Sequence, residues 1–255
     1  MMPARLSVRL IAALLLAPAS LAAAPLLVVT GNDYPPFAAA DLPEGGFSLP
    51  LVKAAFDAAD IEVAIAVVPW RRGYDMVLRG EAIATFPYVE TPERRSETAF
   101  SAPLYDVVQE FVGRRGRATP YSGRPESLKG LTVCMPFGYA LPPALEQYVA
   151  AGEMTRVAPE GLRECAGIVA LARADLMFGD RWSLRQAMAA AGQQASLNPL
   201  LPPFSRIGHH AAFSRAVADW SKLLDGFNRG LELVKARPIY AEWLRANIDA
   251  VPDPP

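Results

Sequence analysis

Cysteine is scarce in this chain, and neither sign of charge predominates. The 255 residues include 2 cysteines, Cys134 and Cys165, which stand too far apart to form a CxxC redox or metal-binding pair. The 25 lysines and arginines nearly balance the 26 acidic residues, leaving a formal net charge of -1. This balance argues against a nucleic-acid partner, because such partners are usually held by a broad basic surface.

Nucleotide and metal signatures are also missing. Neither G-x-x-x-x-G-K-[ST] nor G-x-G-x-x-G occurs in the sequence. The only two histidines, His209 and His210, are adjacent, so in a strand they point to opposite faces. No acidic or cysteine partner stands at metal-ligand spacing from them. We therefore expect no metal site and no cofactor.

The N-terminus carries a short apolar run. Residues 1–9 include two arginines and no acid, and residues 10–17 are entirely apolar. A helix that crosses the hydrocarbon core needs about 20 apolar residues, so this run favours a signal peptide, and the small residues at 20–24 suit its cleavage. We predict a signal peptide over 1–24 and export to the periplasm, with an uncleaved membrane anchor as the alternative.

Export bears on the two cysteines. In an oxidising compartment, Cys134 and Cys165 are expected to form a disulfide. Two buried free thiols remain the alternative, because unpaired cysteine is among the most buried residue types.

Short apolar strands then alternate with amphipathic helices, the pattern of a sheet covered by helices. Thr91-Pro92-Glu93 marks a helix start, with a capping hydroxyl, a proline at the first helical position and an acid in the first turn. Strands are expected at 26–30, 62–68, 83–89, 107–112, 131–135, 154–158, 175–178 and 207–213; helices at 51–59, 71–79, 140–150, 162–172, 181–190, 216–234 and 239–248.

Two stretches interrupt this alternation. The charged, glycine-containing run at 114–117 and the proline-rich run at 199–203 each suggest a crossing between lobes. The C-terminal remainder is too small for a core of its own and should pack back on the first unit. We predict lobe 1 over 25–112 and 205–255, and lobe 2 over 113–204.

The order of elements resembles the bacterial extracellular solute-binding proteins of family 3, which include amino-acid receptors of ABC importers. The resemblance covers nearly the whole mature chain, and it is carried by TGNDYPPF at 30–37, PWRR at 69–72, TPER at 91–94, FSAPL at 100–104 and RADLMFGD at 173–180. It implies an α/β, periplasmic-binding-protein type II-like fold, with two lobes joined by a two-crossing hinge. It also implies a monomer without enzymatic activity that delivers a small polar ligand to an ABC permease in the inner membrane.

The resemblance also implies roles for two charged residues. Arg94 matches an arginine that holds a ligand's α-carboxylate, and Asp180 matches an aspartate that receives the α-ammonium. A guanidinium fork suits a carboxylate, and Asp180 follows a strand where ligands bind in open α/β sheets. The alternatives are a solvated arginine at 94 and a helix N-cap at 180, although the N-cap role of Asp180 is compatible with ligand binding.

Further cleft residues are expected at strand ends and loop starts. Gly138 resembles a position where bare backbone N–H groups approach the carboxylate, and Arg72 would add a second arginine, which favours an acidic ligand. Several aromatic residues should line the cleft, since pockets are mostly apolar: Tyr34, Trp70, Tyr88, Phe137 and Trp182.

The sequence departs from the amino-acid receptors beside its TPER motif. These receptors usually carry small or hydroxyl residues there that accept the ammonium, whereas this chain has Pro87 and Val89, with Glu90 beside them. An amino acid or related carboxylate is therefore the expected ligand class. A periplasmic enzyme of the same fold, dehydratase-like or using Glu90 and Asp180 as a carboxyl pair, is one alternative. A ligand sensor or accessory subunit is the other.

Overall fold

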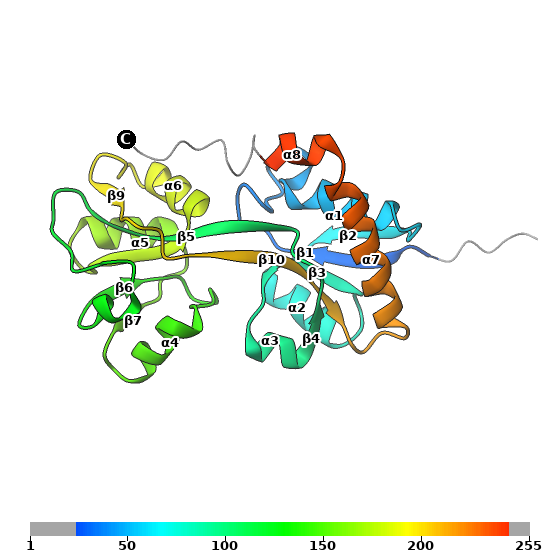
Figure 1. The fold of residues 1–255 in the computed structure, drawn as a ribbon, viewed down its shortest axis with the longest axis horizontal. Helices are drawn as coiled ribbons and strands as arrows, with labels where there is room; N and C mark the ends of the chain where they lie inside the picture. Colours follow the sequence, from blue (N-terminus) through cyan, green and yellow to red (C-terminus); the bar gives the residue numbers. More distant parts are fainter. Residues whose placement is uncertain (1–23, 245–255) are drawn as a thin grey trace, which may run out of the picture.

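The computed structural model describes residues 24–244 and contains two lobes joined by two long strands (Figure 1). The elements of lobe 1 are β1 (Leu26–Thr30), α1 (Ser48–Asp57), β2 (Val63–Val67), α2 (Trp70–Leu78), β3 (Ala84–Val89), α3 (Pro92–Glu97), β4 (Thr98–Phe100), α7 (Trp220–Lys235) and α8 (Pro238–Leu244). Those of lobe 2 are β6 (Thr132–Cys134), α4 (Pro143–Ala150), β7 (Thr155–Val157), α5 (Leu162–Ala170), β8 (Leu176–Asp180), α6 (Arg181–Ala190) and β9 (Leu197–Pro199). Single 3-10 turns lie at Pro43–Gly45 and Pro125–Leu128.

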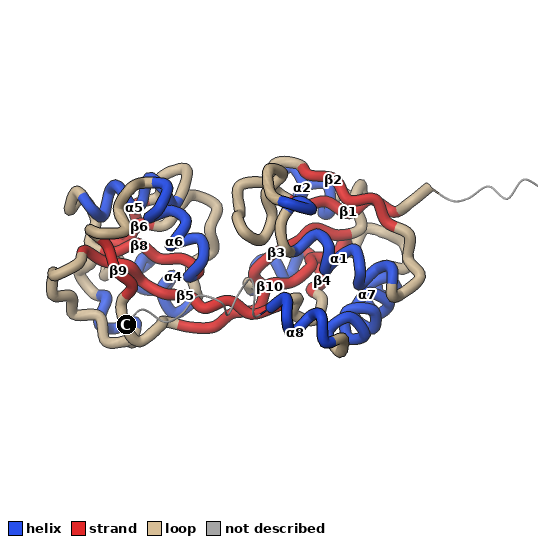
Figure 2. Tube along the Cα trace, turned by 90° about the horizontal axis from the view of Figure 1, so that it is seen from above, coloured by secondary structure: helices blue, strands red, loops and turns tan. Residues whose placement is uncertain are grey.

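The crossing strands are β5 (Tyr105–Arg114) and β10 (Ser205–Ser214). They pair antiparallel with each other, and each also joins the sheet of one lobe, β10 through β3 and β5 through β8. The described chain therefore forms one sheet in the order β2-β1-β3-β10-β5-β8-β6-β7. Both strands run along one side of the molecule, and the two lobes face each other on the other side (Figure 2).

Each lobe has its own apolar core. In lobe 1, α1 and α7 cover one face of the sheet, and the rings of Phe56 and Phe227 lie 4.7 Å apart between them. In lobe 2, Phe111 of β5 and Phe178 of β8 are fully buried with ring centroids 4.7 Å apart. Because each sheet segment buries its apolar side chains separately, the strands between the cores are the natural place for a hinge.

The expected fold class is confirmed: the chain is α/β with two lobes and two crossings. The residue at which each lobe ends stays a prediction, because β5 and β10 run unbroken from one lobe into the other. The expected strands and helices are present, with ends shifted by a few residues, while β4 and β9 were not expected.

The expected signal peptide and the end of the last predicted helix lie outside the described residues. Within residues 24–244, none of the helices is both long enough and apolar enough to cross a bilayer.

Candidate functional site

A cavity of about 570 Å³ lies between the lobes and extends to the crossing strands. Lobe 1 contributes Tyr34, Trp70, Arg71, Tyr74, Asp75, Pro87, Tyr88, Val89, Glu93, Arg94 and Glu97. Lobe 2 and the crossing strands contribute Val107, Gln109, Met135, Phe137, Gly138, Tyr139, Ala140, Phe178, Gly179, Asp180, Ile207 and His209. This volume falls in the range of small-molecule sites, and the lining is largely apolar with a few charged groups.

Arg94 reaches the cavity from the first turn of α3. The Thr91 side chain caps this helix by accepting a hydrogen bond from the Arg94 backbone N–H at 3.2 Å, and Pro92 is its first residue. The Arg94 guanidinium donates to the Val89 carbonyl at 3.0 Å and lies 5.0 Å from the centre of the Tyr88 ring. Among the described residues it forms no ion pair with a carboxylate. Its remaining N–H groups are therefore available to an anionic ligand.

Asp180 lines the cavity from lobe 2, at the last residue of β8. Its Oδ1 accepts from the Ser183 backbone N–H at 2.9 Å, which makes it the N-cap of α6. Its Oδ2 accepts from the Tyr34 hydroxyl at 3.1 Å, across the two lobes. The side chain is buried, and this burial raises the pKa of Asp180. The structure thus contains the expected N-cap, while a role of Asp180 in ligand binding stays a prediction.

His209, on β10, completes a chain of polar contacts with Tyr34. Its Nε2 lies 2.9 Å from the Tyr34 hydroxyl, and its ring stacks on Tyr34, Phe37 and Tyr105. Burial, reinforced by the neighbouring His210 and by the Arg94 guanidinium, lowers the pKa of His209 to about 3. The imidazole is therefore neutral near pH 7. Sequence reasoning considered this histidine only as a metal ligand; the alternation that puts Ile207 and His209 on the same face of β10 was the available signal.

Aromatic rings form one wall of the cavity. Trp70 and Tyr88 meet edge to face at 5.8 Å, and Tyr74 lies 5.4 Å from Tyr88. The Trp70 indole N–H donates to the Asn32 carbonyl at 2.5 Å. A Cβ at Gly31 would lie 1.9 Å from the Trp70 ring, so only glycine lets the first loop pass beneath the indole.

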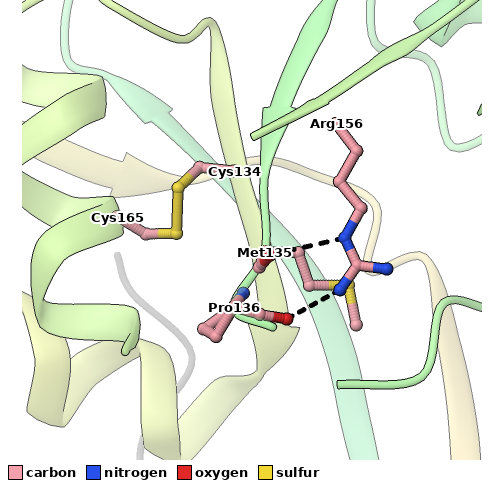
Figure 3. Close-up of a disulfide and its surroundings, with 5 residues drawn as sticks. All are labelled: Cys134, Met135, Pro136, Arg156 and Cys165. Carbon is pink, nitrogen blue, oxygen red and sulfur yellow. Dashed lines mark hydrogen bonds between the residues drawn. A yellow bond between two sulfur atoms is a disulfide. The ribbon is translucent and has the colours of Figure 1, made fainter. Parts of the chain in front are cut away.

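A loop after β6, residues 135–140, forms the facing wall. Figure 3 shows its two attachments, the Cys134–Cys165 disulfide between β6 and α5, and the Arg156 guanidinium. Arg156 donates to the carbonyls of Met135, Pro136 and Tyr139, at 3.4, 2.6 and 3.2 Å. These contacts hold the loop at the cavity. The free-thiol alternative for the cysteines is not what the structure contains.

Two residues of this loop face the opening. Phe137 is 80 % exposed although it lines the cavity, and Gly138 has a φ of 81°. An exposed phenylalanine at a cavity mouth gains apolar contact when a ligand or the opposite lobe approaches.

Seven of the nine residues predicted to bind a ligand line this cavity: Arg94, Asp180, Tyr34, Trp70, Tyr88, Gly138 and Phe137. Arg72 and Glu90 do not. Arg71 takes the place expected for Arg72, because successive helical residues point about 100° apart. Glu90 instead pairs with the exposed Arg95 at 2.7 Å.

Several lining residues were not predicted. Three of them lie on helices, and which side of these helices faces the cavity depends on how the lobes meet: Tyr74, Asp75 and Glu97. The order of the strands in the sheet brings two others, Gln109 and Tyr139, to the cavity. Trp182, weighed as a cleft aromatic, packs beside the core of lobe 1 instead. Among residues 24–244 no group of three histidine, cysteine or acidic side chains has the arrangement of a metal site.

Comparison with known proteins identifies relatives of this fold. The family model described as bacterial extracellular solute-binding proteins, family 3, matches residues 26–247. A comparison with curated proteins found no match.

Many solved structures are similar, and the following three are among them. The GluR0 ligand-binding core from Nostoc punctiforme, in complex with L-glutamate, has a TM-score of 0.69 at 18 % identity, covering 88 % of this chain and 100 % of its own. Holo ArgBP from T. maritima has a TM-score of 0.66 at 23 % identity, covering 87 % and 94 %. A histidine kinase sensor domain with similarity to periplasmic binding proteins has a TM-score of 0.71 at 17 % identity, covering 91 % and 98 %. At these identities the likeness establishes the fold alone.

Proposed function

Because the chain belongs to the bacterial extracellular solute-binding proteins, family 3, we propose that it captures an amino acid or related carboxylate between its lobes in the periplasm and delivers it to an ABC importer. One observation carries this proposal: the Arg94 guanidinium, without a carboxylate partner among the described residues, lies on the wall of a cavity of about 570 Å³ between the two lobes.

The chemistry of capture follows from this geometry. A guanidinium binds a carboxylate through two parallel hydrogen bonds, and such charge-assisted bonds are strong where water is excluded. A ligand held at Arg94 in lobe 1 also contacts the 135–140 loop of lobe 2, since both line one cavity. Binding therefore favours the closed arrangement of the lobes.

We further propose that the protein has no catalysis of its own. The carboxyl pair weighed earlier needs Glu90 and Asp180 on either side of one cavity, and Glu90 does not line it. Asp180 is the N-cap of α6 and accepts from Tyr34, so its oxygens are already bonded within the protein. Nothing in this arrangement calls for a proton transfer to a ligand.

A sensor role is the second candidate, favoured by the similarity to a histidine kinase sensor domain. The same closing cleft would serve transport or sensing, because in both cases a partner protein binds one arrangement of the lobes in preference to the other. Stimulation of a permease's ATPase by the ligand-loaded protein would support transport, whereas co-purification with a membrane kinase would support sensing.

The first prediction tests Arg94. In a thermal-shift screen of amino acids and small carboxylates, compounds that bind the wild type raise its Tm, because they bind only the folded state. Arg94→Ala should lower the affinity for these compounds by roughly 100-fold, as expected for the loss of a buried charge-assisted pair. The matched control is Arg95→Ala, whose side chain is 68 % exposed and pairs with Glu90 outside the cavity. Equal affinities in folded Arg94→Ala and wild-type protein would refute the role of Arg94.

A further inference from the structure

Both oxygens of the buried carboxylate of the cavity already accept hydrogen bonds within the protein. Asp180 accepts from the Ser183 backbone N–H with one oxygen and from the Tyr34 hydroxyl with the other. Its exposed fraction is only 6 %. An ammonium group of a ligand would therefore compete with the Tyr34 hydroxyl for a carboxylate that has little exposed surface left.

The protons around Tyr34 have one consistent arrangement. A hydroxyl has a single proton, so Tyr34 donates either to Asp180 or to His209. If it donates to His209, the imidazole N–H moves to Nδ1, a buried atom without a partner, and an oxygen of Asp180 loses its donor. If it donates to Asp180, His209 Nε2–H donates to Tyr34, and only an acceptor lone pair at Nδ1 remains unbonded. The second arrangement leaves the fewest buried groups unsatisfied.

Two other acceptors that line the cavity also accept hydrogen bonds within the protein. The Gln109 side-chain oxygen accepts from Ser205 at 2.8 Å. The Val89 carbonyl accepts from the Arg94 guanidinium at 3.0 Å. The cavity therefore offers a donor without a carboxylate partner among the described residues, Arg94, while these acceptors are already used within the protein.

Three further carboxylates line the cavity on α2 and α3. Glu93 and Glu97 are exposed, and Glu97 already accepts from the Tyr74 hydroxyl at 2.9 Å. Water screens the charges of these two residues, so they discriminate weakly between ligands. Asp75 is half-buried and lies one helical turn after Arg71, a cation of the same wall that favours a negative charge beside it.

We propose that the cleft selects a carboxylate that carries an aromatic or other apolar body and lacks an α-ammonium group. The carboxylate is held by Arg94, and the body lies between the wall of Trp70 and Tyr88 and the exposed Phe137. Asp180 and Tyr34 then act as a contact between the lobes beside the hinge, since Asp180 pairs with Gln109 of β5 in the sheet. This inference rests on the proposed function of ligand capture.

Pairs of compounds that differ only in the α-ammonium test the inference on the wild-type protein. Titration calorimetry compares 3-phenylpropionate with L-phenylalanine, 4-methylpentanoate with L-leucine, and glutarate with L-glutamate. We expect 3-phenylpropionate to bind roughly tenfold or more tightly than L-phenylalanine, because a buried ammonium would have to compete for acceptors that already bond within the protein. Glutarate should bind more weakly than 3-phenylpropionate, since its second charge would enter an apolar cavity.

Tyr34→Phe provides a second test, because a purely structural role of the Tyr34 hydroxyl would not change the ratio of the two affinities. Loss of the hydroxyl frees one oxygen of Asp180, so the affinity for L-phenylalanine should rise relative to 3-phenylpropionate by roughly tenfold. Tyr121→Phe is the matched control, because the Tyr121 hydroxyl is partly buried and donates to the Pro202 carbonyl in lobe 2, away from the cavity. The control should leave the ratio of affinities unchanged.

The possible outcomes distinguish a failure of this inference from a failure of the proposed function. Tighter binding of the amino acid in each pair overturns the inference and leaves ligand capture intact. An unchanged ratio in folded Tyr34→Phe overturns the role given to the Tyr34–Asp180 contact. If neither compound of any pair binds, and no other carboxylate of the thermal-shift screen does, both the inference and the proposed function fall.

Discussion

Arg94 and Asp180 line the same cavity but differ in what surrounds them. Arg94 contacts a backbone carbonyl and a tyrosine ring, whereas Asp180 is buried among hydrogen-bond donors of the protein. The TPER motif made Arg94 predictable, because its cap and helix start are local. The Tyr34–Asp180 contact spans 146 positions in sequence and the Tyr34–His209 contact spans 175. Contacts at this separation depend on how the lobes meet, so the neighbours of Asp180 could not be derived from the sequence.

The burial of Asp180 has a consequence for stability. Because the folded-state pKa of Asp180 lies above that of the unfolded chain, the unfolded chain loses its proton first as the pH rises. The free energy of unfolding therefore falls as the pH rises from the ordinary aspartate pKa to the raised pKa of Asp180. It stays at this lower level at higher pH. Asp180→Asn removes the titrating carboxyl, while asparagine caps a helix about as well as aspartate.

We expect the Tm of Asp180→Asn, relative to that of the wild type, to rise by roughly 2–4 °C between pH 3 and pH 7, because only the wild type loses stability as this carboxyl ionises. Asparagine has a single acceptor oxygen for the Ser183 N–H and the Tyr34 hydroxyl, so the test is the change of this difference with pH and not its value at one pH. The range starts below the ordinary aspartate pKa of about 3.9. Thermal unfolding across it measures the difference, with Asp41→Asn on an exposed turn as the control. A difference that falls as the pH rises would mean that the charged carboxylate stabilises the fold.

At the scale of elements, the cavity walls differ in how they are supported. The lobe 1 wall rests on helices α2 and α3, and the start of α3 was predictable from Pro92 and the capping hydroxyl of Thr91. The lobe 2 wall is a loop without regular structure, and Arg156 from the neighbouring strand β7 holds it through carbonyl contacts. No local pattern marks a carbonyl-binding arginine, so this support was not predictable. The expected cysteine pair lies at the base of the same loop.

Arg156 is therefore expected to act as a positioning residue. Arg156→Ala should weaken binding of 3-phenylpropionate, or of whichever screened carboxylate binds, by roughly tenfold, because the loop must then be ordered when the ligand binds. Titration calorimetry measures the affinity, and Arg163→Ala on the exposed face of α5 is the control. Arg156→Lys should recover little affinity, since an ammonium lacks the planar fork that reaches several carbonyls. Full affinity in Arg156→Ala would show that the loop is held without it.

At the scale of the whole molecule, two separate cores and two continuous crossing strands suit a hinge motion. Alternation of strands and helices was enough to predict the fold class, since each strand and helix buries its own apolar face. The sheet order brings Gln109, Asp180 and His209 to one place beside the hinge, and this order is a property of the assembled sheet. The Tyr34 contacts with Asp180 and His209 connect the lobes beside the crossing strands. We therefore expect the lobes to move most at the mouth of the cavity, where Phe137 is exposed.

Small-angle X-ray scattering with and without ligand tests the central claim most directly, namely that a carboxylate held at Arg94 closes the two lobes. The ligand is the screened carboxylate with the highest affinity, at a concentration that saturates the wild type. We expect the radius of gyration of the wild type to fall on ligand addition and that of Arg94→Ala to stay unchanged. A wild type that binds the ligand without becoming more compact, or an equal change in both proteins, would contradict the account.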